Sequence, residues 1–140
     1  MKNILSLLFL VSLLDASFIR DNPKMIVLDT TTKLIWQDSN IMYKTWGEAI
    51  EYCANLSHAS FDDWRLPNVS ELASIADLSK YSPTIDPSFK QITDARYWSS
   101  TTKVADTSTA WSVNFRNGSI DSPAEKSSDF YVRCVRSINN

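Results

Sequence analysis

The chain has 140 residues, of which 44% are hydrophobic and 11% aromatic, with 14 Lys and Arg against 16 Asp and Glu. This length and this apolar content predict one domain with a hydrophobic core, and they exclude a disordered chain. Because only 2 residues are Gly and 5 are Pro, a collagen-like or low-complexity chain is excluded as well. The slightly acidic balance offers no basic surface for nucleic acid or for an anionic membrane.

The first 17 residues have the pattern of a secretory signal peptide. Lys2 precedes an apolar run over residues 4–14, and the small residues Ala16 and Ser17 follow. As a helix the run covers about 17 Å, against a hydrocarbon core of roughly 30 Å, so we expect a cleaved signal over 1–17 and no membrane span afterwards. The exact cleavage position stays open, and a buried N-terminal helix is the alternative.

The expected organisation of the mature chain is a linker over residues 18–24, a domain over 25–137 and a tail over 138–140. Cleavage would release this product into the periplasm or the medium. Its two cysteines, Cys53 and Cys134, are then predicted to form one disulfide, because exported proteins meet an oxidising compartment. A zinc site is the alternative, but it would find only His58 beside the two thiols.

The first half of the domain shows a hairpin and a helix. The apolar runs 25–28 and 33–36 flank a turn of Asp and Thr residues, which predicts two paired strands. Thr45 and Glu48 have the spacing of a capping box, so we expect a helix over 46–56 with its cysteine facing inward.

A second helix is expected after Pro67, where Asn68 and Glu71 repeat the N-cap spacing, and it should fade near Ser79. A long loop over residues 80–96 follows, because this segment has little periodicity.

Strands are expected in the last third of the chain. Residues 97–101 and 110–115 have strand-like patterns, and the strict alternation of the second places Trp111, Val113 and Phe115 on one face. Asn117-Gly118 predicts a type I′ turn into residues 119–121, and 130–135 is the expected last strand. Two helices followed by strands and long loops indicate the α+β class.

Six segments, in this order, resemble the Lcl C-terminal domain family over about residues 27–136, a family named for the bacterial collagen-like adhesin that it ends. They are Val27…Asp29…Thr32-Lys33-Leu34-Ile35-Trp36-Gln37; Trp46…Ala49-Ile50…Tyr52-Cys53…Leu56; Asp63-Trp64-Arg65-Leu66-Pro67-Asn68…Glu71-Leu72; Tyr97-Trp98-Ser99-Ser100-Thr101; Ala110-Trp111…Val113…Phe115…Gly118; and Val132-Arg133-Cys134-Val135-Arg136. The resemblance implies a C-type lectin-like fold related to formylglycine-generating enzymes. It also implies a disulfide between the first helix and the last strand, in agreement with Cys53 and Cys134.

The chain departs from the family pattern at two places. Lys33 stands where the family usually has Gly, and a positive φ there would cost about 1 kcal/mol. His58-Ala59-Ser60-Phe61 replaces the glycines usual before Asp63-Trp64-Arg65. Both differences concern local loop shape.

No constellation of catalytic residues can be assembled from the sequence, so we expect no enzyme and no cofactor. His58 is the single imidazole, and neither a nucleophile elbow nor a glycine-rich phosphate loop is present. Formylglycine-generating enzymes use late cysteines, and Cys134 is expected in the disulfide. A hydrolase with paired acids is a distant alternative.

The motifs that mark calcium-dependent sugar binding in C-type lectins do not occur, so binding without metal is expected. Scattered aspartates could supply oxygen ligands, but surface acids are the preferred interpretation; they are Asp77, Asp86, Asp94, Asp106, Asp121 and Asp129.

Most other conspicuous side chains have structural interpretations. We expect the five tryptophans, Trp36, Trp46, Trp64, Trp98 and Trp111, in the core. Arg65 should bond backbone carbonyls or a carboxylate such as Asp62 or Glu71, and His58 should lie in a solvated loop. Arg133 and Arg136 could be paired or could line a surface.

The resemblance also implies a binding region, because ligands of C-type lectin-like folds meet the long-loop region, which corresponds here to residues 79–131. Its aromatic and guanidinium side chains suit sugar rings or a protein partner, and the candidates are Tyr81, Phe89, Arg96, Tyr97 and Arg116. Tyr81 and Phe89 could instead pin the loop to the core. We therefore expect an exported, non-catalytic module that binds a glycan or surface polymer in adhesion. An envelope structural or assembly domain that binds a protein is the alternative.

Overall fold

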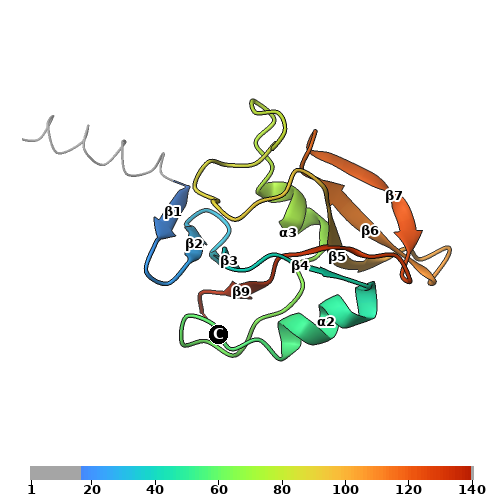
Figure 1. Cartoon of the computed structure of the whole chain (residues 1–140), viewed down its shortest axis with the longest axis horizontal. Helices are drawn as coiled ribbons and strands as arrows, with labels where there is room; N and C mark the ends of the chain where they lie inside the picture. The colour runs from blue at the N-terminus through green and yellow to red at the C-terminus, as the bar shows by residue number, and fades with distance from the viewer. Residues whose placement is uncertain (1–16, 140) are drawn as a thin grey trace, which may run out of the picture.

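The computed structural model describes residues 17–139, so the predicted signal segment 1–16 lies outside the described residues. In chain order the elements are β1 (Phe18–Asp21), β2 (Ile26–Asp29), β3 (Leu34–Gln37), β4 (Met42–Lys44), α2 (Trp46–Ala54), α3 (Val69–Ser74), β5 (Arg96–Thr102), β6 (Thr109–Asn114), β7 (Ser119–Glu125), β8 (Phe130–Val132) and β9 (Val135–Ser137). The described part of the chain is thus an α+β domain with two helices and mostly antiparallel strands, as predicted (Figure 1).

The first sheet has the order β1-β2-β3-β9 and is antiparallel throughout. The predicted hairpin is confirmed as β2 and β3, with Leu28 opposite Ile35. The linker expected over 18–24 is corrected, because residues 18–21 form β1 on the free edge of β2. The ladder extends one residue further, since the Ser17 carbonyl accepts a hydrogen bond from the Thr30 N–H at 2.7 Å.

The second sheet has the order β4-β8-β5-β6-β7, and its one parallel pairing joins β5 to β8 at Tyr97 and Tyr131. The single last strand expected over 130–135 is wrong. The chain pairs with β4 and β5 as β8, crosses through Arg133 and Cys134, and then pairs with β3 as β9 in the other sheet. Two partners in two sheets impose this break, and the strand pattern of the segment does not reveal it.

Both helices begin where their capping residues predict. The Glu48 carboxylate accepts from the Thr45 N–H at 3.2 Å at the start of α2, and Asn68 and Glu71 bond reciprocally at the start of α3. Both end before the predicted residue. At the end of α3 the Asp77 carboxylate accepts from the backbone N–H and the hydroxyl of Ser79, a local turn that competes with further helix.

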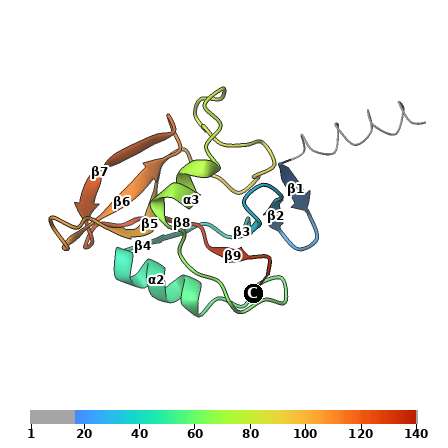
Figure 2. The ribbon, with the colours of Figure 1, turned by 180° about the vertical axis from the view of Figure 1, so that it is seen from behind.

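The helices pack on the second sheet. Contacts join α2 to β5, and α3 to β5, β6 and β7; Figure 2 shows α3 beside these strands from behind. Residues between the two sheets form one core cluster around Trp36 and Tyr97, and a second cluster around Trp98 and Cys53 lies beneath α2. The core thus holds both sheets and both helices together.

Three of the five tryptophans are buried as predicted, namely Trp36, Trp64 and Trp98. Trp46 is half-buried, and its indole N–H donates to the Ser99 carbonyl at 2.9 Å. Trp111 is also only half-buried, which corrects the expected core position. The pairing of β6 with β7 shifts register between Ala110 and Ser112, and this bulge breaks the alternation that the sequence suggested.

The hairpin between β6 and β7 exists, but its turn is not the predicted two-residue type I′ turn. Asn114 pairs with Ser119, so residues 115–118 form the loop, and Gly118 alone among these described residues has a positive φ, 79°. Because Phe115 is fully buried and its N–H donates to the Ala95 carbonyl, the chain leaves the ladder earlier than the pattern indicates.

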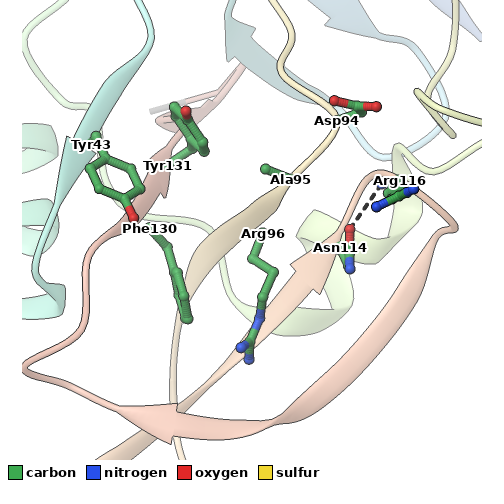
Figure 3. Close-up of a pocket in the computed structure, with 8 residues that line it drawn as sticks. All are labelled: Tyr43, Asp94, Ala95, Arg96, Asn114, Arg116, Phe130 and Tyr131. Atoms are coloured by element: carbon green, nitrogen blue, oxygen red, sulfur yellow. Dashed lines mark hydrogen bonds between the residues drawn. The ribbon is translucent and has the colours of Figure 1, made fainter.

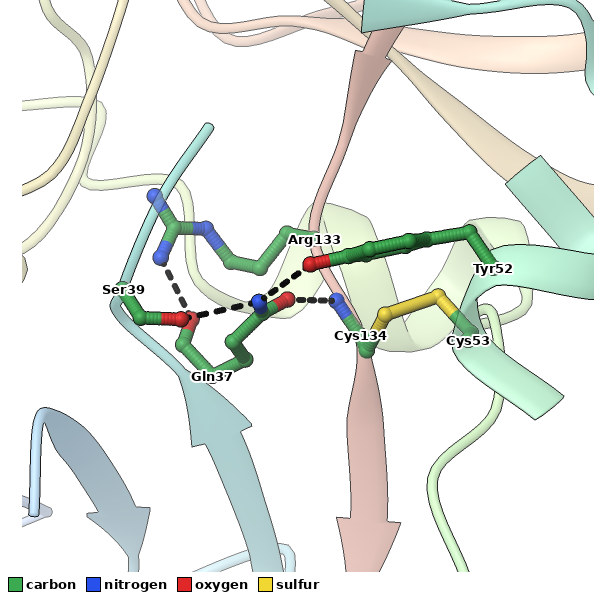
Figure 4. The surroundings of a disulfide bond; sticks show 6 residues. All are labelled: Gln37, Ser39, Tyr52, Cys53, Arg133 and Cys134. Atoms are coloured by element: carbon green, nitrogen blue, oxygen red, sulfur yellow. Dashed lines mark hydrogen bonds between the residues drawn. A yellow bond between two sulfur atoms is a disulfide. The ribbon is translucent and has the colours of Figure 1, made fainter. Parts of the chain in front are cut away.

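A disulfide joins Cys53 in α2 to Cys134 between β8 and β9, as predicted (Figure 4). Gln37 organises its surroundings: its side-chain amide donates to the Tyr52 hydroxyl at 3.1 Å and accepts from the Cys134 N–H at 3.2 Å. None of the described helices is long and apolar enough to cross a membrane.

Lys33 has a left-handed backbone conformation, with φ of 60°. This is the conformation expected from the resemblance, which implies Gly at this position. We expect Lys33→Gly to raise the free energy of unfolding by about 1 kcal/mol, because Gly has no Cβ to clash in this conformation. Chemical unfolding followed by tryptophan fluorescence measures the change. Lys24→Gly is the matched control, since Lys24 is also exposed and has no positive φ. An equal gain in both variants would contradict the strain argument.

The loop over residues 58–61, the second place where the chain departs from the family pattern, also has residues with positive φ. Ala59 and Ser60 have φ of 54° and 66°, so the loop keeps a glycine-type shape without glycine. His58 lies in this loop, half-buried, with Nε2 3.1 Å from the Met25 carbonyl and its ring against Trp64. The loop is therefore attached to the residue that precedes β2 and to the core, and His58 is less solvated than predicted.

Candidate functional site

An open pocket of about 380 Å³ lies where the start of β5 meets β8 (Figure 3). Tyr97 and Tyr131 are the pair that joins these parallel strands, and the residues before them in each strand, Arg96 and Phe130, line the opening. We call it the aromatic pocket, and its lining residues are Tyr43, Asp94, Ala95, Arg96, Asn114, Arg116, Phe130 and Tyr131.

One wall of the aromatic pocket consists of ring faces. Tyr43 on β4 stands opposite Tyr131 on β8, and the ring centroids are 4.9 Å apart. The Tyr43 side chain is 61% exposed, although large aromatic residues are usually well covered. Phe130 also lines the pocket, and its ring lies against the Arg96 guanidinium. The sheet thus holds an exposed ring in place against a second ring.

Arg96 also lines the pocket and is held firmly. Its Nε and Nη2 donate to the Ser112 hydroxyl at 3.1 and 3.0 Å, and Nη2 also donates to the Ser122 carbonyl at 3.1 Å. Nε lies 3.1 Å from an Asp121 carboxylate oxygen, and Cζ lies 4.3 Å from the centre of the Phe130 ring. Nη1 has no hydrogen-bond partner among residues 17–139, so a fixed guanidinium presents a free donor.

The far rim of the aromatic pocket carries exposed polar groups. The Asn114 side-chain oxygen accepts from the Arg116 N–H at 3.0 Å, and the Arg116 guanidinium has no partner in the described part of the chain. The Asp94 carboxylate accepts from the Ser82 hydroxyl. Charges of both signs therefore line the rim.

The structure gathers two of the five sequence candidates, Arg96 and Arg116, in this pocket. Phe89 and Tyr97 are corrected: both are buried in the core and are not available to a ligand at the surface. Burial raises the pKa of the Tyr97 phenol, which therefore stays protonated. Tyr81 is 71% exposed but does not line the aromatic pocket.

Sequence reasoning missed the three rings of the aromatic pocket. Phe130 and Tyr131 lie inside the expected region 79–131, but the sequence pattern indicates only that they belong to a strand. Tyr43 lies outside that region, in a three-residue strand. The exposed tyrosine could be found only after β4 was known to pair with β8.

The remaining arginines have structural roles. Arg65 donates two hydrogen bonds to Glu71 at 2.7 and 2.8 Å, as expected. These bonds lower the pKa of the Glu71 carboxyl and raise the pKa of Arg65. Arg136 pairs with Asp63, and Arg133 is buried beside Asp38. The question left open by the sequence is thereby answered: Arg133 and Arg136 are paired and do not line the aromatic pocket.

The chemistry of the aromatic pocket is that of recognition. The faces of the aromatic rings offer apolar contacts of defined orientation, and the guanidinium groups can donate hydrogen bonds to ligand oxygens. Within residues 17–139 no group of three or more His, Cys, Asp or Glu side chains is arranged to hold a metal ion.

Comparison with known proteins gives one result at the level of the family. No curated protein matches the chain. The family model described as Lcl C-terminal domain matches residues 25–136. This range begins just before β2 and ends within β9, so it includes both sheets except β1, both helices, the disulfide and the aromatic pocket. The chain belongs to the Lcl C-terminal domain family.

Proposed function

We propose that this chain is an exported, non-catalytic module that binds a glycan or a surface polymer through the aromatic pocket without a metal ion. The observation that carries the proposal is that one pocket is lined both by the exposed Tyr43 ring, fixed against Tyr131, and by Arg96, whose guanidinium is ordered. A sugar ring presents a C–H face to an aromatic ring and hydroxyl oxygens to a guanidinium. The pocket supplies both complements in one place.

The proposal extends to the fold and the compartment. A C-type lectin-like architecture, related to that of formylglycine-generating enzymes, is supported by the disulfide between α2 and the segment that precedes β9. The same bond supports export, since disulfides persist in oxidising compartments. Cleavage after Ala16 would leave the Ser17 carbonyl bonded to Thr30, whereas cleavage after Ser17 would remove this residue from the ladder.

The test is binding of the purified oxidised protein to a glycan array, with calcium and with EDTA. We expect binding that EDTA does not change. Tyr43→Ala should lower the affinity for the bound glycan about tenfold, because a central aromatic contact is worth more than about 1 kcal/mol.

Tyr81→Ala is the matched control, since Tyr81 is also exposed but lies outside the aromatic pocket. An equal loss in both tyrosine variants would contradict this location of the site, and loss of binding in EDTA would contradict the metal-free interaction. Absence of binding to every glycan would overturn the proposal and favour an envelope protein as the partner.

A further inference from the structure

A second open pocket, of about 440 Å³, adjoins the aromatic pocket on the side of β7. Its lining residues are Arg96, Asp121, Ser122, Pro123 and Ala124, and we call it the β7 pocket. Arg96 lines both pockets. The two openings therefore share one wall instead of lying on separate parts of the surface.

The irregular pairing of β7 shapes this second pocket. Ala124 pairs with Ala110 and Asp121 pairs with Ser112, so Ser122 and Pro123 together stand opposite the single residue Trp111. Such a bulge bends the strand and turns side chains away from the regular ladder. Bulges often occur beside functional sites for this reason.

The Arg96 side chain contacts groups that line each of the two pockets. The Phe130 ring lies under its guanidinium on the side of the aromatic pocket, and the Ser122 carbonyl and Asp121 carboxylate receive it on the side of β7. A side chain held from both sides loses little conformational entropy when a ligand binds. Its free Nη1 donor is thus in place before binding.

We infer that the aromatic pocket and the β7 pocket are two consecutive subsites of one groove, which takes an internal stretch of a linear glycan chain. The inference rests on the proposed function and names the form of its ligand. A single sugar would leave one pocket empty. Neighbouring sugar units of one glycan chain fill both pockets and place a sugar oxygen at Arg96. Because the units are covalently linked, binding of one unit raises the effective concentration of the next at its pocket and so raises the overall affinity.

The experiment measures binding by calorimetry for oligosaccharides of increasing length. The probes are cello-, malto-, laminari-, manno- and chito-oligosaccharides of one to about eight units. In the series that binds, we expect the affinity to rise at least about tenfold from the monosaccharide and to level off once both subsites are filled. Equal affinity at every length would overturn the two-subsite groove and leave the proposed function intact. Absence of binding in every series would overturn both.

Variants locate the second subsite. Ser122→Tyr fills the β7 pocket and should reduce the affinity of long oligosaccharides to that of short ones, while short oligosaccharides keep their affinity at the aromatic pocket. Ser127→Tyr is the matched control, because Ser127 is exposed and lines neither pocket. Ser122→Lys gives a second test should the tyrosine variant fold poorly, with thermal unfolding as the check. If both Ser122 variants keep the full length dependence, the assignment of the β7 pocket is overturned.

Discussion

Replacing Asp38 with alanine is expected to lower the free energy of unfolding by about 3–5 kcal/mol. The Asp38 carboxylate is fully buried and accepts hydrogen bonds from Arg20, from Arg133 at 2.8 Å, and from the N–H groups of Lys90 at 2.8 Å and Gln91 at 3.1 Å. It thereby joins β1, the crossing between the two sheets, and the long loop.

The cost arises from the charge that the change leaves behind. Arg133 is only 3% exposed, and without Asp38 its guanidinium would keep two backbone carbonyls and the neighbouring rings but no carboxylate. An unpaired buried cation is far less favourable than either the intact pair or an apolar replacement. The loop around Lys90 and Gln91 should also become more mobile, because the backbone N–H groups of these two residues lose their hydrogen bonds to the Asp38 carboxylate.

Urea unfolding followed by tryptophan fluorescence measures the effect, and amide hydrogen exchange over residues 86–92 measures the loosening of the loop. Asp38→Asn keeps an acceptor of the same shape and should lose less stability than Asp38→Ala. Asp62→Ala is the control, because Asp62 is exposed, and it should stay within about 0.5 kcal/mol of the parent. A loss at Asp38→Ala no larger than this control would show that the buried cluster contributes little.

Removing the disulfide is expected to cost about 4.5 kcal/mol in the chain-entropy model, since the bond closes a loop of 81 residues. The double variant Cys53→Ala, Cys134→Ala avoids free thiols, and its unfolding free energy is compared with that of the oxidised parent. Both sulfur-bearing residues are fully buried, so the native protein should resist reduction until it unfolds.

Thiol labelling of the purified protein, denatured but not reduced, should find no free cysteine. Two labelled thiols per chain would contradict the bond and the oxidising compartment inferred from it. A double variant as stable as the parent would show that the connection of α2 to the β8–β9 crossing is maintained by packing and by the hydrogen bonds around Gln37 (Figure 4).

The ion pairs of the arginines show that the sequence indicates partners that are close along the chain but not distant ones. Arg65 and Glu71 are six residues apart, and Glu71 is one of the nearby partners that the sequence suggests for Arg65. Arg133 and Asp38 are 95 residues apart, and no pattern in either segment indicates that they meet. The same contrast holds at the proposed site, where Arg96 and Arg116 were singled out but Tyr43 was not. Export and the absence of catalysis stay predictions.

The sequence by itself determined the features that arise within a few residues of one another or from residue type alone. These are the α+β class, the helix starts at Thr45 and Asn68, the β2–β3 hairpin, the glycine-type backbone suspected at Lys33, and the pairing of two cysteines that have no other partner. In each case capping, turn chemistry or sulfur chemistry acts locally or leaves one solution.

Only the tertiary structure decided where strands find distant partners. It added β1 at the edge of β2, divided the last strand between two sheets, inserted the bulge beside Trp111 and brought Tyr43 against Tyr131. Strand pairing depends on which strand edges are free after the core has packed, and the residues of a segment do not by themselves indicate which edge it will pair with. The aromatic pocket and the β7 pocket exist because of these long-range pairings.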